Sequence, residues 1–418
     1  MSTPITVEQA REAALSMVTP LGAERVALTE ALGRVLAADA RSDIDVAPFD
    51  NSAMDGFAVR AADLASATAE TPVILEVAAD IPAGTWWDGP LAPGQAARIM
   101  TGAPVPAGAD TVVMVEVTRT ASGDGSIGSR VAFAQAPGEG DHIRRRGEEV
   151  SAGEVVLSAG EVIGPAAVGL LAATGHATVE VFRRPRVAVI STGSELVEVG
   201  MAPGPGKIRN SNSYSLAAQV RAAGGEPLRY PIVHDDVAAI EAAFLRAAEE
   251  ADYIITSGGV SVGDFDFVRP VLERIGKLAF YKVAMRPGAP QTMGRVGDTP
   301  VFGLPGNPTS AYVGFEVFVR PVLRKMQGHT ALERPRVTAR LAHDVRKRAE
   351  KRYYLRARLS ASGAPGLEVE LAGSQSSALL SAAHRGNCLL VLEAGESHFS
   401  AGSLVECMRL DIEEGVVL

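Results

Sequence analysis

Between residues 186 and 326 the sequence alternates short apolar runs with longer segments of helical spacing, and this alternation restricts the fold more than any other feature. The run at 186–192 is apolar without a break from Val187 to Ile190, which is typical of a strand buried on both faces. Further strand-like runs lie at 227–233, 252–258, 278–285 and 300–306, with helical patterns at 212–225, 237–250, 267–276 and about 308–326. This order predicts a parallel, doubly wound sheet.

The segments on either side of this region have a different texture. Between about 46 and 145, short β-type runs separated by Gly/Pro turns predict a β-rich module. The first 40 residues have helical spacing, and residues 147–180 combine short strands with an Ala-rich helix. We therefore expect these two stretches to form one discontinuous domain around the β-rich insertion. The last 90 residues are strands again and predict a small β-barrel or sandwich.

Length and charge restrict the class of protein. A chain of 418 residues exceeds one ordinary core, so several domains are expected. Its 40 basic and 49 acidic residues give a net charge of −9, which argues against a nucleic-acid partner. The longest uncharged run, 162–179, is broken by Pro165 and three glycines, so we expect a buried helix and no membrane partner.

The termini and cysteines indicate a cytoplasmic protein. The N-terminus has no apolar signal core, and Thr6 is placed to cap an amphipathic helix. Cys388 and Cys407, the two cysteines of the chain, lie in apolar stretches without a CxxC spacing. Buried free thiols are expected, and a disulfide scaffold is excluded.

Polar turns follow four of the expected strands. They comprise residues 191–195 (STGSE), 234–236 (HDD), 256–266 (TSGGVSVGDFD) and 304–308 (LPGNP). Open α/β sheets bind ligands at the carboxyl ends of their strands, and glycine beside serine lets backbone N–H groups approach an anion. The sequence therefore predicts a polar, anion-binding pocket at this edge. A formal GxGxxG match at 123–128 lies between two β runs and opens no helix, so we interpret it as a hairpin loop.

Charged residues near these turns suggest a cation as well as an anion. The carboxylates Glu195, Asp235 and Asp266 suit Mg²⁺ held together with substrate phosphates. Lys282 and Arg286 alternate on one expected strand and are placed to face the same side. The stretch 334–358 carries ten basic residues, which form either a solvated face or a rim that attracts an anionic ligand.

A second polar group lies in the β-rich half, at 48–59, 99–106 and 143–148. Polar residues this dense beside Phe and Met do not follow from strand alternation. Composition alone leaves structural turns and a functional site both open.

Six segments together resemble the molybdopterin molybdenumtransferase family, which includes the MoeA proteins and the C-terminal region of gephyrin-like proteins. They are PFDNSAMDGFAVR, RIMTGAPVPAGAD, IRRRGEE, VISTGSEL, TSGGVSVGDFD and GLPGNPTSA, in this order over nearly the whole chain. The resemblance implies an elongated α/β plus β multidomain subunit. Its expected parts are a mixed helical linker domain (1–45 with 146–181), a β-rich inserted domain (46–145), a doubly wound, MogA-like α/β domain (182–327) and a C-terminal β-barrel-like domain (328–418).

The resemblance also implies the reaction and the assembly. Adenylylated molybdopterin and molybdate would react in the presence of Mg²⁺ to give the molybdenum cofactor and AMP. The site would be shared in a homodimer, between the α/β domain of one subunit and the β-rich domain of the other. Molybdopterin adenylyltransferase and molybdoenzyme maturation proteins are candidate partners.

Residue roles follow from the same resemblance, position by position. Asp55 and Thr101 are expected to be catalytic and to come from the partner subunit. Glu195, Asp235, Asp266 and Lys282 are the expected catalytic positions of the α/β domain, with Glu195 and Asp235 as metal ligands. Expected substrate-binding residues are Arg144, Thr192, Gly193, Ser257, Gly258, Gly259, Ser261, Gly263, Asp264, Arg286, Pro305, Gly306, Asn307 and Pro308.

One departure from the family pattern concerns the oxyanion. A KPGKP-like stretch is replaced here by RPGAP at 286–290, so that one lysine becomes Arg286 and another is lost to Ala289. Arginine keeps the charge but changes the hydrogen-bond geometry. The resemblance leaves molybdate and tungstate both open.

Two other functions compete with the transferase. A non-catalytic molybdopterin-binding or gephyrin-like scaffold protein would keep the fold without turnover. An adenylyltransferase is disfavoured, because that activity needs only the α/β domain.

Overall fold

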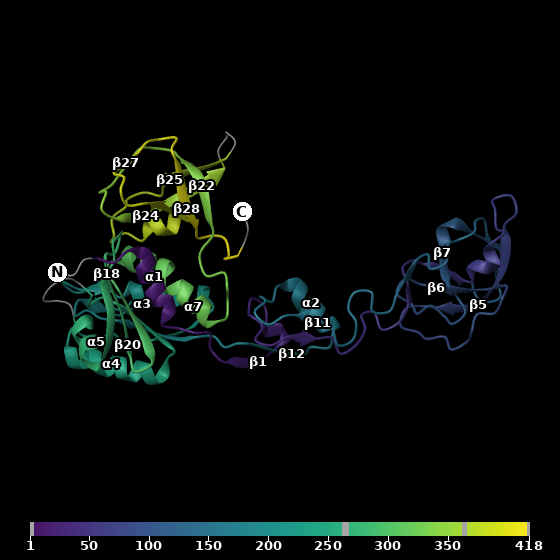
Figure 1. Ribbon diagram of the computed structural model, residues 1–418, viewed down its shortest axis with the longest axis horizontal. Helices are drawn as coiled ribbons and strands as arrows, with labels where there is room; N and C mark the ends of the chain where they lie inside the picture. The colour runs from purple at the N-terminus through teal and green to yellow at the C-terminus, as the bar shows by residue number, and fades with distance from the viewer. Residues whose placement is uncertain (1–3, 261–266, 362–365, 416–418) are drawn as a thin grey trace.

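The computed structural model describes residues 4–260, 267–361 and 366–415 of an elongated molecule. Two bulky ends are joined by a narrow middle (Figure 1). One end holds the α/β domain and the C-terminal barrel, the middle holds a small linker module, and the other end holds a distal β-rich module. The elongated multidomain α/β plus β architecture is as predicted.

The α/β domain is built on a six-stranded sheet. In spatial order its strands are β16 (Glu226–Arg229), β13 (Arg186–Ser191), β17 (Tyr253–Ser257), β21 (Thr299–Leu304), β20 (Pro290–Val296) and β18 (Gly276–Lys282). The first four are parallel, and every side chain of β17 and β21 is buried.

Helices cover both faces of this sheet, so the domain is doubly wound. One face packs against α4 (Val237–Glu250) and α5 (Val268–Ile275). The other packs against α3 (Ser211–Ala222) and against the continuous helix formed by α6 (Pro308–Gly314), the π-helical segment η4 (Phe315–Val319) and α7 (Arg320–Met326).

The expectation of a wholly parallel sheet is wrong at one edge. β20 and β18 run antiparallel, and β20 was not predicted. Its sequence hides the strand because Gln291 and Thr292 are polar yet buried. Gly294 is also required there, since a Cβ atom would lie 2.6 Å from the carbonyl oxygen of Lys277.

The C-terminal domain is a closed five-stranded barrel. We predicted a barrel or a sandwich for this region. Its strands are β22 (Arg336–Leu341), β24 (Arg352–Ala361), β25 (Leu367–Leu371), β26 (Cys388–Leu392) and β28 (Leu404–Arg409). The circuit closes because β24 pairs with both β25 and β26. Short elements complete the domain: β23 (Val345–Arg346), β27 (His398–Phe399) and α8 (Ser381–Arg385). Cys388 and Cys407 are free and buried in it, as expected.

The N-terminal helix α1 (Val7–Ser16) differs in position from our expectation. Thr6 caps it as predicted, in a capping box with Gln9. Its buried residues Val7, Ala10 and Ala14 pack into the core of the α/β domain, against the α6–η4–α7 side. The helix therefore lies apart from the discontinuous domain in which we placed it.

The linker module consists mainly of short antiparallel pairs. β1 (Ala23–Ala27) pairs with β12 (Thr178–Phe182), and β2 (Ala40–Arg41) pairs with β11 (Val155–Leu157). The second helix that we expected within the first 40 residues is wrong: that segment contains β1 and the one-turn η1 (Leu28–Glu30). Pairing with β12, which is distant in sequence, overrides the local helical spacing.

The Ala-rich run at 162–179 does form a helix, α2 (Pro165–Ala173), but not a buried one. Only Leu171 of this helix is buried. None of the helices in the described ranges is both long and apolar enough to cross a bilayer.

The distal module is a second six-stranded sheet, in the order β7-β4-β6-β5-β9-β8. The strands are β4 (Gly56–Val59), β5 (Val73–Ile81), β6 (Gln95–Ile99), β7 (Thr111–Met114), β8 (Thr118–Ser122) and β9 (Arg130–Phe133). β8 and β9 are antiparallel neighbours, so residues 123–128 form the turn between them. The GxGxxG match is therefore a hairpin loop, as predicted. A short pair, β3 (Asn51–Ser52) and β10 (Ile143–Arg144), lies beside the sheet.

Candidate functional site

A cleft of about 1400 Å³ lies between the carboxyl ends of the parallel strands and the barrel. The turns after β13, β17 and β21 line one side, and barrel residues between 345 and 378 line the other. The predicted residues in its lining are Thr192, Gly193, Glu195, Asp235, Ser257, Gly258, Gly259, Arg286, Pro305, Gly306, Asn307 and Pro308. The expectation that four strand ends meet in one polar pocket is confirmed.

Two carboxylates lie on the α/β wall of the cleft. The Ser194 N–H donates to Asp235 Oδ2 (2.9 Å), and the Asp235 N–H donates to Ser194 Oγ (3.3 Å). These reciprocal bonds join the turn after β13 to the segment after β16. A Cβ atom on Gly193 would lie 2.6 Å from Glu195 Oε2, so glycine is needed for the Glu195 carboxylate to fold back over the turn.

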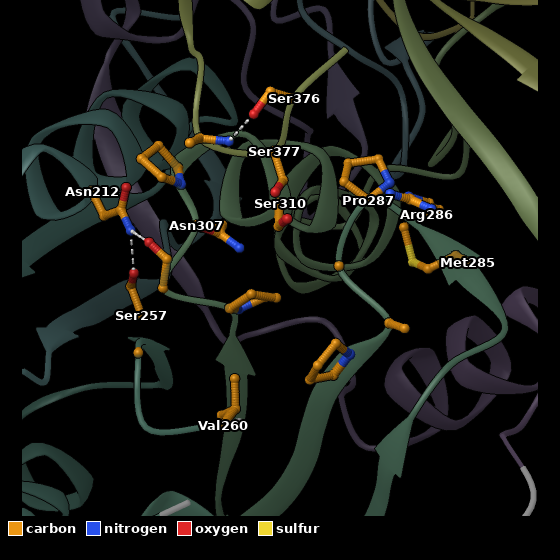
Figure 2. A pocket seen from close by; sticks show the side chains of 18 of the residues that line it. Asn212, Ser257, Val260, Met285, Arg286, Pro287, Asn307, Ser310, Ser376 and Ser377 are labelled. Atoms are coloured by element: carbon orange, nitrogen blue, oxygen red, sulfur yellow. Dashed lines mark hydrogen bonds between the residues drawn. The ribbon is translucent and has the colours of Figure 1, made fainter. Parts of the chain in front are cut away.

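The turns after β17 and β21 are joined by one side chain from α3. Asn212 Nδ2 donates to Ser257 Oγ (2.7 Å) and to the carbonyl oxygen of Gly306 (2.8 Å), as Figure 2 shows. Gly258 has a φ of +96°, and a Cβ atom there would lie 2.4 Å from the carbonyl oxygen of Thr192. Only glycine allows this close approach of the two turns.

Several buried polar atoms in the cleft lining have no hydrogen-bond partner among the described residues. They are Ser191 Oγ, Thr192 Oγ1, Asn210 Nδ2 and Arg356 Nε. Buried polar atoms in native proteins are nearly always paired. Four orphans around one cleft indicate that a polar ligand completes it.

Arg356 is the most unusual of these residues. It lies on β24 with 1% of its surface exposed, and it forms no ion pair with any described carboxylate. Burial lowers the pKa of its guanidinium to about 10. Nη2 donates to the carbonyl oxygen of Ser376 (3.1 Å), and Ser310 and Ser377 line the cleft nearby (Figure 2). An uncompensated buried cation beside hydroxyl groups is a site for an anion.

Sequence reasoning missed Arg356 as a site residue. It belongs to the basic stretch 334–358, which we left as a solvated face or an anion-attracting rim. The available signal was local: Arg356 lies between the apolar residues Leu355 and Ala357. No acidic residue lies opposite it in the pairing with β26.

The described part of the cleft could hold Mg²⁺ only if a substrate supplied further ligands. No group of three or more acidic, histidine or cysteine side chains among the described residues could hold a metal ion alone. Glu195 and Asp235 supply two carboxylates to the same cleft, and Mg²⁺ commonly takes one or two carboxylates plus substrate phosphates. Asp266, Ser261, Gly263 and Asp264, which we also predicted for this site, lie outside the described residues.

Lys282 and Arg286 do not share a strand, contrary to our expectation. β18 ends at Lys282, and Arg286 belongs to β19 (Met285–Arg286), which pairs with β24 of the barrel. The Val283 N–H donates to the carbonyl oxygen of Ala289 (2.9 Å), which closes residues 283–289 into a loop that carries Arg286 to the barrel. Arg286 lines the cleft, with its guanidinium 5.8 Å from the centre of the Tyr353 ring, whereas Lys282 is absent from the described lining.

In the distal module the structure brings Asp55 and Thr101 together. Asp55 Oδ1 accepts hydrogen bonds from the backbone N–H and the hydroxyl of Thr101, each 2.7 Å long. These two bonds hold the pKa of the exposed Asp55 carboxyl below its ordinary value. The residue after Asp55 must be glycine, because a Cβ atom on Gly56 would lie 2.0 Å from the carbonyl oxygen of Val113.

Arg144 lies in a separate place. It pairs with Asn51 across β10 and β3, and it lines a smaller cavity of about 440 Å³. Both Arg144 and the Asp55–Thr101 pair belong to the distal half of the molecule, far from the cleft of the same chain (Figure 1). The two predicted groups of site residues therefore do not meet within one subunit.

Three family models match successive parts of the chain. Residues 5–175 match the MoeA N-terminal region (domain I and II), residues 188–325 match a probable molybdopterin binding domain, and residues 338–410 match the MoeA C-terminal region (domain IV).

Individual relatives agree. The chain is 38% identical to the molybdopterin molybdenumtransferase of Bacillus subtilis, over 99% of this chain and 96% of that protein. It is 48% identical to molybdopterin molybdenumtransferase 2 of Mycobacterium tuberculosis, over 79% of this chain and 82% of that protein. A crystal structure of the molybdopterin biosynthesis MoeA protein from Pyrococcus horikoshii superposes with a TM-score of 0.83 at 30% identity, covering 98% of this chain and 99% of that one. The sequence identity extends over nearly the full length, and the order of domains and the fold are the same. This chain therefore belongs to the MoeA family.

Proposed function

We propose that this chain is a molybdopterin molybdenumtransferase, which inserts molybdenum from molybdate into adenylylated molybdopterin and releases AMP. The observation that carries the proposal is the composition of the cleft. Two carboxylates lie on its α/β wall, and its barrel wall holds a buried arginine that has no carboxylate partner among the described residues. A phosphorylated ligand needs carboxylates that hold Mg²⁺ at its phosphates. The oxyanion that reacts with it needs a positively charged side chain. The name shared by the curated relatives supports this reaction.

The residues divide the work by charge. Glu195 and Asp235 would hold Mg²⁺, which neutralises phosphate charge at the anhydride. Arg356, with the hydroxyl groups of Ser310 and Ser377, would hold the dianionic oxyanion. The turns at Ser257–Gly259 and Pro305–Pro308 would wrap the pterin phosphate and align it, a step that positioning alone can accelerate greatly.

We further propose that the site is shared in a homodimer. Asp55 and Thr101 lie at the far end of the molecule from their own cleft (Figure 1). Large apolar side chains are exposed beside them: Met54 (40%), Val115 (46%) and Val117 (39%), and the Val115 N–H donates to the carbonyl oxygen of Asp55 (3.0 Å). Apolar groups around a polar pair are typical of a surface that a second subunit covers.

Molybdopterin adenylyltransferase, as the supplier of substrate, and molybdoenzyme maturation proteins, as receivers of product, are the partners this reaction requires. Free buried thiols and the absence of a spanning helix among the described residues support a cytoplasmic reaction.

The direct test measures AMP release by the purified protein with adenylylated molybdopterin, Mg²⁺ and molybdate. We expect AMP and an active cofactor in equal amounts. Binding of molybdopterin without any AMP release would instead identify a scaffold protein.

The shared site is tested by mixing two impaired variants, Asp55→Asn and Glu195→Gln, at a Mg²⁺ concentration at which neither variant alone releases AMP. Each mixed dimer contains one site with both changes and one with neither. Random exchange should restore roughly a quarter of the native activity. No recovery, with exchange verified by mass, would place both residues in one subunit's site.

A further inference from the structure

The turn between β23 and β24 carries four cations on the wall of the cleft. These residues, 346–351, include Arg346, Lys347, Arg348 and Lys351, and all four line the cleft. Arg346 and Arg348 are exposed, and Lys351 is half-buried. We call residues 346–351 the cationic turn.

No described carboxylate forms an ion pair with the cationic turn, although Glu350, Glu393 and Glu396 are close enough to act on the charge of Lys347. Its own acidic residue, Glu350, forms no ion pair with the four cations there. Elsewhere in the same basic stretch Arg336 pairs with Glu406, and Arg352 pairs with Glu8 and Glu393. Arg340 and Arg358 lie opposite Glu368 and Glu370 in their strand pairings. Five cations of the stretch, the four of the cationic turn and Arg356, line the cleft instead.

The turn is held in shape from the inside. Lys347 is only 9% exposed, and its Nζ donates to the carbonyl oxygens of Arg348 (3.3 Å) and Lys351 (3.1 Å). The same Nζ lies 5.4 Å from the centre of the Tyr353 ring. The Lys347 N–H donates to Ser397 (2.9 Å), and the Gly395 N–H donates to Ala349 (2.8 Å). These bonds fix the turn that presents the three other cations.

Such a cluster is unfavourable on its own. A buried ammonium group without a carboxylate costs desolvation energy, and three neighbouring cations repel one another. In a chain of net charge −9, this local excess of positive charge is not a general property of the surface. It is located where an anion would enter, on the wall that also contains Arg356.

We propose that Arg346, Arg348 and Lys351 form an entry surface that draws the tetrahedral oxyanion dianion into the cleft and passes it to Arg356. This inference rests on the proposed function for the nature of the anion. The entry surface acts on association, whereas Arg356 acts on the bound state. Clefts lined by one sign of charge raise the on-rates of small ions by about 10- to 1000-fold, and salt screens this effect.

The test compares a neutralised entry surface, R346Q/R348Q/K351Q, with a control matched in charge, R340Q/R358Q/R385Q. Arg340, Arg358 and Arg385 are exposed on the same barrel and lie outside the cleft lining. Both proteins lose positive charge from one domain, but only the first loses it at the cleft. Their circular dichroism spectra and unfolding midpoints are compared with those of the native protein.

The first readout is binding of molybdate alone, followed by stopped-flow and by calorimetry. At low salt we expect the association rate of the R346Q/R348Q/K351Q protein to fall about tenfold, and the difference to vanish near 1 M salt, where the Debye length is only about 3 Å. The control should follow the native salt dependence. An unchanged association rate and salt slope in the triple variant would overturn the proposal.

The second readout separates the oxyanion from the other anionic substrate. In AMP-release assays, kcat/KM for molybdate should fall about as much as the association rate, and kcat much less. A fall confined to kcat/KM for adenylylated molybdopterin would assign the turn to the phosphates and overturn the proposal. A change in dimer mass would assign it to a protein interface, with the same consequence.

Failure of the two proposals is distinguishable. Native protein that binds molybdate with the expected salt dependence but releases no AMP would refute the proposed function and leave the entry surface in place. Native protein that releases AMP, with a triple variant indistinguishable from the control, would do the reverse.

Discussion

Asp55 and Thr101 are 46 positions apart in the sequence, and both hydrogen-bond donors of Thr101 point at one oxygen of Asp55. The carboxylate is exposed, so these two bonds, not burial, lower its pKa. A charged Asp55 is thereby available at lower pH than for an isolated aspartate.

Thr101→Val should raise the pKa of Asp55. The substitution removes the hydroxyl donor and leaves the backbone donor, so the pKa of Asp55 rises and its charged form is lost at higher pH as the solution is acidified. We expect the acid limb of the kcat/KM profile that reports Asp55, which lies below the ordinary aspartate pKa of 3.8, to shift to higher pH. Thr101→Ser, which keeps the hydroxyl, should retain the native profile. Coincident profiles for the valine and serine variants would contradict a role for the pair in setting this charge.

Arg356→Met should separate stability from activity. Removing a buried cation without a carboxylate partner costs little folding free energy, so the unfolding midpoint should stay the same or rise. Loss of a charge-assisted site should lower kcat/KM for molybdate by about 10- to 100-fold. Arg358→Met, on the exposed face of the same strand, is the control. A variant that is both less stable and fully active would show that Arg356 is structural.

Glu414→Gln should destabilise the fold. Its side chain is fully buried and lies among Arg320, Arg324 and Arg334, which tie the end of the chain to α7. Breaking one partner of such a buried network costs about 3–5 kcal/mol of the free energy of unfolding. Glu413→Gln, the exposed neighbour, should change it little.

The effect of Glu414 should also depend on pH. Burial raises the pKa of its carboxyl, but the hydrogen bond and charge of Arg320 outweigh this and keep the pKa below its ordinary value of 4.5. Its contribution to stability is therefore present above the unfolded pKa and is lost as the pH falls through the folded pKa. Denaturant unfolding should show the native protein and the glutamine variant converging on acidification.

Glu195→Gln and Asp235→Asn should weaken the use of Mg²⁺. Each removes one of the two carboxylates in the described cleft lining. The Mg²⁺ concentration for half-maximal AMP release should rise on the order of tenfold. Calorimetric binding of Mg²⁺ in the presence of nucleotide provides a second readout. Glu249→Gln, on the exposed face of α4, should keep the native Mg²⁺ requirement. A rise of the same size in this variant would contradict the assignment of Glu195 and Asp235 as Mg²⁺ ligands.

The sequence predicted most of the cleft because parallel strands end at one edge of their sheet. Thr192, Ser257 and Asn307 could therefore be grouped before their distances were known. Arg356 was not predicted, because its role depends on which side of the barrel packs against the α/β domain. That contact joins segments distant in sequence, and no local pattern encodes it.

The errors in the fold have a similar cause. β1 has a local helical spacing but pairs with β12, about 150 residues away in the chain. β20 carries buried polar residues, so its strand pattern is absent from the sequence. α1 has the expected cap and length, but its apolar face does not specify which core receives it.

The position of α1 has a consequence for synthesis of the chain. Its buried face packs against segments that end at Met326, and residues 23–182 of the linker and distal modules lie between them in the sequence. Domains generally fold in order as they leave the ribosome. Helix α1 must therefore wait, with its apolar face uncovered, until the linker module, the distal module and the last helix of the α/β domain have been made.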